Sequence, residues 1–121
     1  MTTTDTTTTV ELAALTRAIE GLDADAIAAR YAEGATLTLL DRDHPPSSPQ
    51  LISGRDAIRT YFRDVCGRNV NHEVRDAVAT DGGIAFTQHC RYPDGTRVVC
   101  AAVATLERGL IVRQTIVQTW D

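Results

Sequence analysis

ATLTLLDRDHPPSSPQLISGRDAIRTYF, residues 35–62, contains in order a predicted strand, a proline-rich loop and an amphipathic helix. Leu37 and Leu39 alternate with polar residues, which predicts a short strand over Thr36–Leu40. The segment Asp41–Pro49 holds three prolines and two serines, which favour turns and remove backbone donors, so it is predicted to be an irregular loop.

The helix after this loop is predicted to begin near Ser53 and to end at Gly67. Ser53 and Asp56 have the spacing of a capping box, in which each side chain bonds a backbone amide of the other residue. The residues at helical spacing that are expected to form its buried face are Ala57, Ile58, Tyr61, Phe62 and Val65.

A first helix is predicted at the N-terminal end of the chain. Thr8 and Glu11 have capping-box spacing, so the helix is expected to begin near Thr9. Its apolar stripe consists of Leu12, Leu15, Ile19 and Leu22. Residues 1–8 lack the basic and apolar regions of a signal peptide. They are expected to form a flexible threonine-rich tail.

A second helix is predicted directly after the first. Asp23 follows a Gly-Leu break and has a side chain suited to capping a helix. Ile27 and Tyr31 supply apolar positions, and Gly34 is expected to end the helix.

The second half of the chain is predicted to consist of strands. Glycine-containing turns separate the four strand-like segments, and such short turns join antiparallel neighbours. The segments are Asn71–Thr80, Ile84–Tyr92, Thr96–Glu107 and Leu110–Trp120. The order of elements predicts an α+β fold, with the helices on one face of a bent sheet.

Composition limits the function classes. A chain of 121 residues with 43% hydrophobic residues is expected to form a single domain, here residues 9–121. The net charge of −4 argues against nucleic-acid and anionic-membrane surfaces. Cys66, Cys90 and Cys100 have no metal-type spacing, and we expect reduced thiols in a cytoplasmic protein.

Three runs carry a resemblance to the nuclear transport factor 2-like superfamily, in its SnoaL-like and ketosteroid-isomerase-like branch. They are LDADAIAARYAEGATL (Leu22–Leu37), GRDAIRTYF (Gly54–Phe62) and RGLIVRQTIVQ (Arg108–Gln118). The resemblance implies a cone-shaped α+β barrel, with three helices packed on a curved, mostly antiparallel sheet and a pocket between them. Isomerases, cyclases, dehydratases, hydrolases and binding proteins share these runs, so the resemblance implies a fold and no single reaction.

The ketosteroid isomerases of this branch use a carboxylate base, a tyrosine and a protonated aspartic acid. Aligning the shared runs places Leu39, Leu15 and Val103 at these three positions. None of these side chains ionises or donates a hydrogen bond. Steroid isomerisation by that apparatus is therefore not expected.

Alternation along the aligned strands predicts which side chains face the pocket, although a slip of one residue would reverse any strand. The predicted inward residues are His72, Val74, Asp76, Val78, Phe86, Gln88, Cys90, Tyr92, Val99, Ala101, Val103, Gln114, Ile116, Gln118 and Trp120. The predicted outward set, suited to sheet-to-sheet contact in a homodimer, is Cys100, Ala102, Ala104, Thr115 and Val117.

His72 and Asp41 are the candidate catalytic residues. An imidazole transfers protons near neutral pH, although His72 could instead have a structural role at the rim. Asp41 ends the first strand, where apolar neighbours could raise the pKa of its carboxyl group into the range of a useful base. The alternative is that Asp41 caps a turn.

Further residues are candidates for contact with a substrate. Gln88 and Gln118 could orient a ligand oxygen, or their amides could be satisfied within the protein. Cys90 could be a nucleophile if His72 lowered the pKa of its thiol, or it could be inert. The aromatic candidates are Tyr31, Tyr61, Phe86 and Trp120. No metal site is expected, because the histidines and Cys90 lack ligand spacing.

These observations lead to three hypotheses. The first is an enzyme that transfers protons on a hydrophobic oxygenated small molecule without a cofactor, as an isomerase, cyclase or dehydratase. The second is a binding protein with the same pocket and no catalysis. The third is a structural dimer whose pocket is vestigial.

Overall fold

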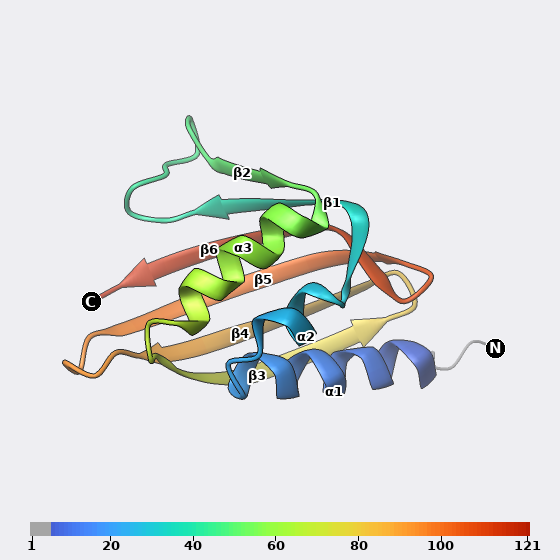
Figure 1. Cartoon of the computed structure of the whole chain (residues 1–121), viewed down its shortest axis with the longest axis horizontal. Coiled ribbons are helices and arrows are strands. Elements are labelled where there is room, and N and C mark those ends of the chain that lie inside the picture. The colour runs from blue at the N-terminus through green and yellow to red at the C-terminus, as the bar shows by residue number, and fades with distance from the viewer. Residues whose placement is uncertain (1–5) are drawn as a thin grey trace.

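The computed structural model describes residues 6–121, and their side chains from residue 11 onward. The elements are α1 (Thr6–Glu20), α2 (Ala24–Ala28), β1 (Tyr31–Leu40), β2 (Gln50–Ser53), α3 (Arg55–Cys66), β3 (Asn71–Thr80), β4 (Gly83–Arg91), β5 (Arg97–Glu107) and β6 (Leu110–Trp120). The helices lie on one face of the sheet, with α3 crossing its middle strands and α1 running along β3 (Figure 1).

The six strands form one sheet in the order β2-β1-β6-β5-β4-β3. All neighbours are antiparallel except β1 and β6, which are parallel. The α+β class, with three helices on a bent sheet, is confirmed. The sheet is open, with β2 and β3 at its edges, so the predicted barrel does not close.

The four strands of the second half are confirmed, with bounds that differ from prediction by one residue or less. They pair as a continuous antiparallel meander. Gly95 and Gly109 have φ values of 91° and 77° in the turns on either side of β5. Glycine adopts this left-handed region without strain, which explains why the turns fall where the sequence predicts them.

The two N-terminal helices differ from prediction at their ends. α1 begins at Thr6 rather than near Thr9, while residues 1–5 and the Thr8 side chain lie outside the described part. Asp23 caps α2 as predicted and accepts a hydrogen bond from the Ala26 amide at 3.1 Å. α2 ends at Ala28, however, because Tyr31 already pairs with Ile111 of β6. The prediction that Gly34 ends this helix is therefore wrong.

A short strand was not predicted before α3. β2 pairs with β1, and this pairing holds Ser53 opposite Thr36. Gly54, at φ 92°, is the N-cap of α3, and no side chain caps the helix, so the capping box of Ser53 and Asp56 is wrong. α3 ends at Gly67 as predicted, with Ile58 as its most buried residue and Ala57 exposed.

The inward and outward faces agree with prediction on β4 and β6 and are reversed on β5. Cys100 pairs with Gln88, and directly opposite residues share a face, so Cys100 faces inward. The buried residues of β5 are Val98, Cys100, Ala102, Ala104 and Leu106. The inward prediction for Val99, Ala101 and Val103 is therefore wrong, as is the outward prediction for Cys100, Ala102 and Ala104.

A bulge changes the face of β3 partway along the strand. His72 is buried and Val74 half-buried, as the inward prediction requires. The register then shifts between Arg75 and Val78, with Asp76 at φ 55°. An extra residue in one strand turns the following side chains to the other face. Val78 is consequently 64% exposed, so the inward prediction for Asp76 and Val78 is wrong.

Candidate functional site

A small cavity lies between α3 and the inner face of the sheet, and we refer to it as the inner cavity. Its volume is about 60 Å³, compared with about 300–1,000 Å³ for sites that hold drug-sized ligands. The lining residues are Tyr61, Phe62, Val65, Arg68, Val70, His72, Gln88, Cys90, Tyr92, Val98, Cys100, Ile116, Gln118 and Trp120.

A thiol, an imidazole and an amide meet on the wall of the inner cavity. His72 on β3 pairs directly with Cys90 on β4, and the His72 Nδ1 atom lies 3.1 Å from the Cys90 sulfur. Gln88 is two residues before Cys90 and so shares its face. The Gln88 Nε2 atom is 2.9 Å from His72 Nδ1 and 3.6 Å from the Cys90 sulfur. Antiparallel pairing thus brings together three residues that the sequence predicted to face inward.

The Cys90 thiol is more acidic than an ordinary cysteine. A hydrogen bond with Cys100 is the largest influence and lowers the pKa of Cys90; burial opposes it, and contacts with His72 and Gln88 lower it further. The same bond, together with burial, raises the pKa of Cys100. The pKa of Cys90 is therefore lowered and that of Cys100 raised, so Cys90 is the more acidic thiol of the pair.

His72 has two ring nitrogens in different surroundings. Nδ1 lies within hydrogen-bond distance of Cys90 and Gln88. Because the Gln88 amide nitrogen can only donate, Nδ1 is the acceptor in that contact, and neutral His72 carries its ring proton on Nε2. Nε2 is buried and meets no hydrogen-bonding partner among the described residues. A buried polar atom without a partner costs about 1–3 kcal/mol, so a ligand group at Nε2 would remove an unfavourable contribution.

Tyr61, Gln118 and Trp120 supply further polar atoms to the lining of the inner cavity. The Trp120 indole nitrogen donates to Gln118 Oε1 at 3.3 Å. Burial, together with the nearby Cys100, raises the pKa of Tyr61 to about 12, against the opposing effects of the Arg68 charge and of a hydrogen bond with Gln118. The Tyr61 hydroxyl therefore remains protonated at neutral pH and can donate a hydrogen bond.

The loop after β1 reaches the end of the inner cavity. This loop and the end of β6 lie at the same end of the sheet (Figure 1). The Arg42 guanidinium is 4.2 Å from the centre of the Trp120 ring, which is a cation–π contact. The Tyr92 ring also packs against Trp120, with the two ring centres 5.6 Å apart. No sequence pattern predicts a role for Arg42, because a residue in an irregular loop has no periodicity that would place it.

Asp41 has the geometry of a turn-capping residue. Its Oδ1 atom is 2.8 Å from His44 Nδ1 and accepts a hydrogen bond from the Asp43 amide at 2.9 Å. Desolvation acts to raise the pKa of Asp41, but the hydrogen bonds with His44 and Asp43 outweigh it and the pKa is lowered. The expected rise in pKa is therefore wrong. Asp41 does not line the inner cavity, and its catalytic role stays a prediction.

The remaining predicted site residues divide between the inner cavity and the core. Tyr61, Gln118 and Trp120 line the inner cavity. Phe86 lies in the core, and Tyr31 is buried and donates a hydrogen bond to Gln114. Cys100 was missed as a site residue, because the prediction for β5 placed it on the opposite face.

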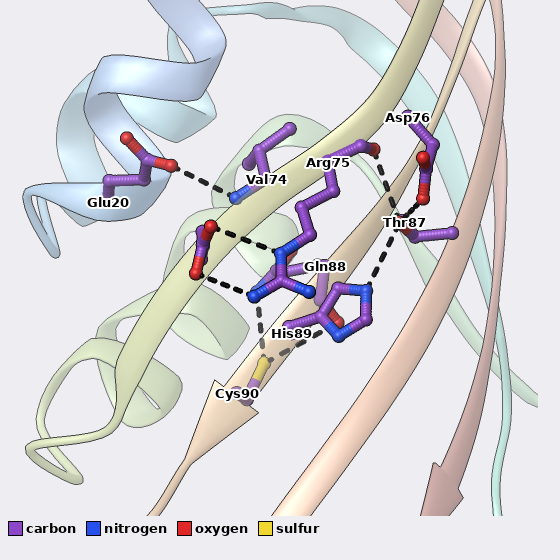
Figure 2. Close-up of polar contacts among 9 residues, drawn as sticks. Glu20, Val74, Arg75, Asp76, Thr87, Gln88, His89 and Cys90 are labelled. Atoms are coloured by element: carbon purple, nitrogen blue, oxygen red, sulfur yellow. Dashed lines mark hydrogen bonds and ion pairs between the residues drawn. The ribbon is translucent and has the colours of Figure 1, made fainter.

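A larger hollow, of about 600 Å³, lies on the outer face of the sheet. Figure 2 shows part of this face, where Arg75 and Thr87 project from β3 and β4. Arg75 makes two bonds to Glu73, at 3.0 and 3.1 Å, and Thr87 donates to Asp76 at 2.8 Å. These polar groups pair with one another on an exposed surface, so the inner cavity is the better candidate for chemistry.

The described histidine, cysteine and acidic side chains form no group of three or more that could hold a metal ion. None of the described helices is long and apolar enough to span a membrane.

The open mixed sheet, with helices on one face and a cavity between them, defines an α+β domain with a candidate small-molecule site (Figure 1). The chain belongs to the SnoaL-like domain family, whose sequence profile matches residues 12–114. A comparison with curated proteins finds no match.

Solved structures support this fold at low sequence identity. A nuclear transport factor 2-like protein of unknown function from Mesorhizobium loti superimposes with a TM-score of 0.81, at 13% identity over 93% of this chain and 91% of that one. A candidate ketosteroid isomerase from Kribbella flavida gives 0.76, at 18% identity over 93% and 78%. SalBIII, an epoxide hydrolase/cyclase-like enzyme in pyran ring formation, gives 0.71, at 24% identity over 93% and 90%.

Proposed function

We propose that the chain is a SnoaL-like enzyme that transfers protons next to the carbonyl group of a compact, hydrophobic oxygenated molecule, without a cofactor. The observation that carries this proposal is His72, which is buried against Cys90 and Gln88 on the wall of the inner cavity. Isomerisation, cyclisation and dehydration can each begin with removal of such a proton. Two of the similar structures have names from isomerase and cyclase chemistry, which is consistent with this class.

The proposed division of roles follows the chemistry of each group. His72 takes the proton, because its imidazole is buried on the wall of the inner cavity and is the side chain there suited to accepting one. Tyr61, whose hydroxyl stays protonated, donates a hydrogen bond to the substrate oxygen as negative charge develops there. Gln88 positions the His72 ring by a hydrogen bond, and Gln118 positions the Trp120 indole in the same way.

A second candidate is a binding protein without turnover. The apolar residues Leu15 and Leu39 at two of the isomerase positions favour it, as does the small volume of the inner cavity. This candidate predicts that a ligand raises the melting temperature and is recovered unchanged.

Proton exchange in D₂O distinguishes these two candidates. We expect the folded protein to accelerate the replacement of α-hydrogens by deuterium in compact ketones such as butanone and cyclopentanone, observed by proton NMR. The same chain unfolded in urea, with the urea-matched buffer subtracted, controls for catalysis by free side chains. Ketones that stabilise the fold without any accelerated exchange would favour the binding protein and overturn the enzyme.

We further propose that the chain forms a homodimer through the outer face of the sheet. Val78 and Val103 lie in one row across β3, β4 and β5, because both pair with Ala85. They are 64% and 62% exposed, and Val117 on β6 is 47% exposed. Sedimentation velocity at micromolar concentration is expected to give a dimer, and Val103→Arg is expected to give a monomer. A wild-type monomer at that concentration would contradict the proposal.

A further inference from the structure

The sulfur of Cys90 is the point on which the polar groups of the inner cavity converge. His72 Nδ1 lies 3.1 Å away and Gln88 Nε2 lies 3.6 Å away. Cys100, on the neighbouring strand, pairs with Gln88 and faces the same side of the sheet. Donors that converge on one sulfur stabilise a thiolate, and the thiolate is the nucleophilic form of cysteine.

We propose that Cys90 is a nucleophile that adds to the β-carbon of a compact α,β-unsaturated carbonyl compound. In this step His72 accepts the thiol proton, and the sulfur electron pair forms the new S–C bond. The π electrons of the C=C bond move toward the carbonyl oxygen, which gives an enolate. His72 then returns the proton to the α-carbon, so that the product is a saturated thioether and no oxidant or reductant is required.

Because the addition can be reversed, Cys90 can catalyse the interconversion of the two geometric isomers of the substrate. In the adduct the former double bond is a single bond, about which the substrate can rotate. Removal of the α-proton by His72 and loss of the thiolate then release the other geometric isomer and restore Cys90. This inference names the substrate class of the proposed enzyme and therefore rests on that function, although the reactivity of Cys90 can be tested separately.

The charges around the inner cavity favour a thiolate. The titratable groups that line it are His72 on β3, Cys100 on β5, Tyr61 on α3, and Arg68 and Tyr92 from the adjoining loops. Arg68 donates to the Tyr92 hydroxyl at 3.3 Å and forms an ion pair with Asp64, so its positive charge is balanced by a carboxylate. No carboxylate from the described part of the chain lines the inner cavity, so no negative side chain there opposes ionisation of Cys90.

The size of the inner cavity limits the substrate. A volume of about 60 Å³ suits a molecule of a few heavy atoms. The lining combines the apolar side chains Phe62, Val70 and Val98 with the polar cluster. Acrylamide, which has five heavy atoms and a conjugated carbonyl group, is therefore a suitable probe.

Cys66 provides an internal control in the same chain. It lies at the end of α3 and is more accessible than Cys90, which is 7% exposed. Burial and the charge of Asp23 raise the pKa of Cys66, whereas the pKa of Cys90 is lowered. Accessibility alone predicts faster reaction at Cys66, while the proposed nucleophile predicts faster reaction at Cys90.

The test is a time course of acrylamide addition to the folded, reduced protein at pH 6.5, with each cysteine quantified by mass spectrometry of its peptide. We expect Cys90 to react about threefold or more faster than Cys66, because a much larger fraction of Cys90 is thiolate at this pH and the lower nucleophilicity of the more acidic thiolate cancels only part of that advantage. The advantage of Cys90 should shrink as pH rises toward 9. His72→Asn should slow Cys90 and leave Cys66 unchanged.

Faster reaction at Cys66, or reaction at Cys90 only in urea, would overturn the proposal. The wild-type protein separates this outcome from failure of the proposed function. If Cys90 is unreactive towards acrylamide and the wild-type protein still exchanges ketone α-hydrogens, only the nucleophile is excluded. If Cys90 is labelled as expected but no ketone exchanges with the wild-type protein, the nucleophile stands and the proton-transfer function fails.

Discussion

Replacing His72 with asparagine is expected to lower the rate of α-hydrogen exchange by about 10²–10⁴-fold, which is the usual contribution of a positioned general base. Asparagine keeps a polar side chain beside Cys90 and Gln88 but has no group that accepts a proton near neutral pH. His72 is buried and contacts these two residues, so asparagine is a closer replacement than an apolar residue. The measurement is the exchange rate by proton NMR, with circular dichroism to verify the fold.

His44→Asn is the matched control for this substitution. His44 lies in the loop after β1, where its ring bonds the Asp41 carboxylate, and it does not line the inner cavity. We expect this variant to exchange within about twofold of the wild-type protein, as is usual for a substitution away from the reacting atoms. A folded His72→Asn protein with full exchange activity would exclude His72 as the base, whatever the other residues do.

The arrangement of the strands could be predicted because local signals agree with the final pairing. The segments of β3 to β6 are separated by short glycine-containing turns, and such turns connect only antiparallel neighbours. α3 was predictable from apolar residues at helical spacing and from Gly67. The end of α2 was not predictable from the sequence. Tyr31 continues the apolar spacing of the helix, and the strand preference of one tyrosine is too weak to outweigh that pattern. Pairing with Ile111 decides its conformation, and that contact is remote in sequence.

The candidate site was predictable where polar and apolar residues alternate. On β4, Phe86, Gln88 and Cys90 share the face that the alternation indicated. The sequence of β5, RVVCAAVATLE, is apolar on both faces, so its pattern does not distinguish one face from the other. Cys100 was missed for this reason, although it governs the acidity of Cys90. The bulge at Asp76 could not be predicted from the sequence either, because it depends on one residue with positive φ and produces no repeating pattern of residue types.

Ala102→Asp is expected to destabilise the fold by about 4 kcal/mol or more, because it buries an unpaired carboxylate. Ala102 is 3% exposed and lies between Phe86 of β4 and Ile116 of β6, which are themselves 5% and 9% exposed. None of these neighbours can donate a hydrogen bond from its side chain. A domain of this size is typically stable by about 5–15 kcal/mol, so the substitution removes much of that stability. Urea unfolding followed by circular dichroism measures the loss.

Ala101→Asp is the matched control, because it makes the same chemical change one residue away on the same strand. Ala101 is exposed on the outer face, where Thr87 and Val117 are its neighbours. We expect a cost of about 1 kcal/mol or less, within the range of strand preference at an exposed position, measured at low protein concentration so that association does not contribute. The sequence pattern places Ala101 on the inner face and Ala102 on the outer face of β5, so it predicts the opposite result, with Ala101→Asp the more destabilising substitution. A larger loss of stability in Ala101→Asp than in Ala102→Asp would therefore move Cys100 to the outer face and separate it from Cys90 and the inner cavity.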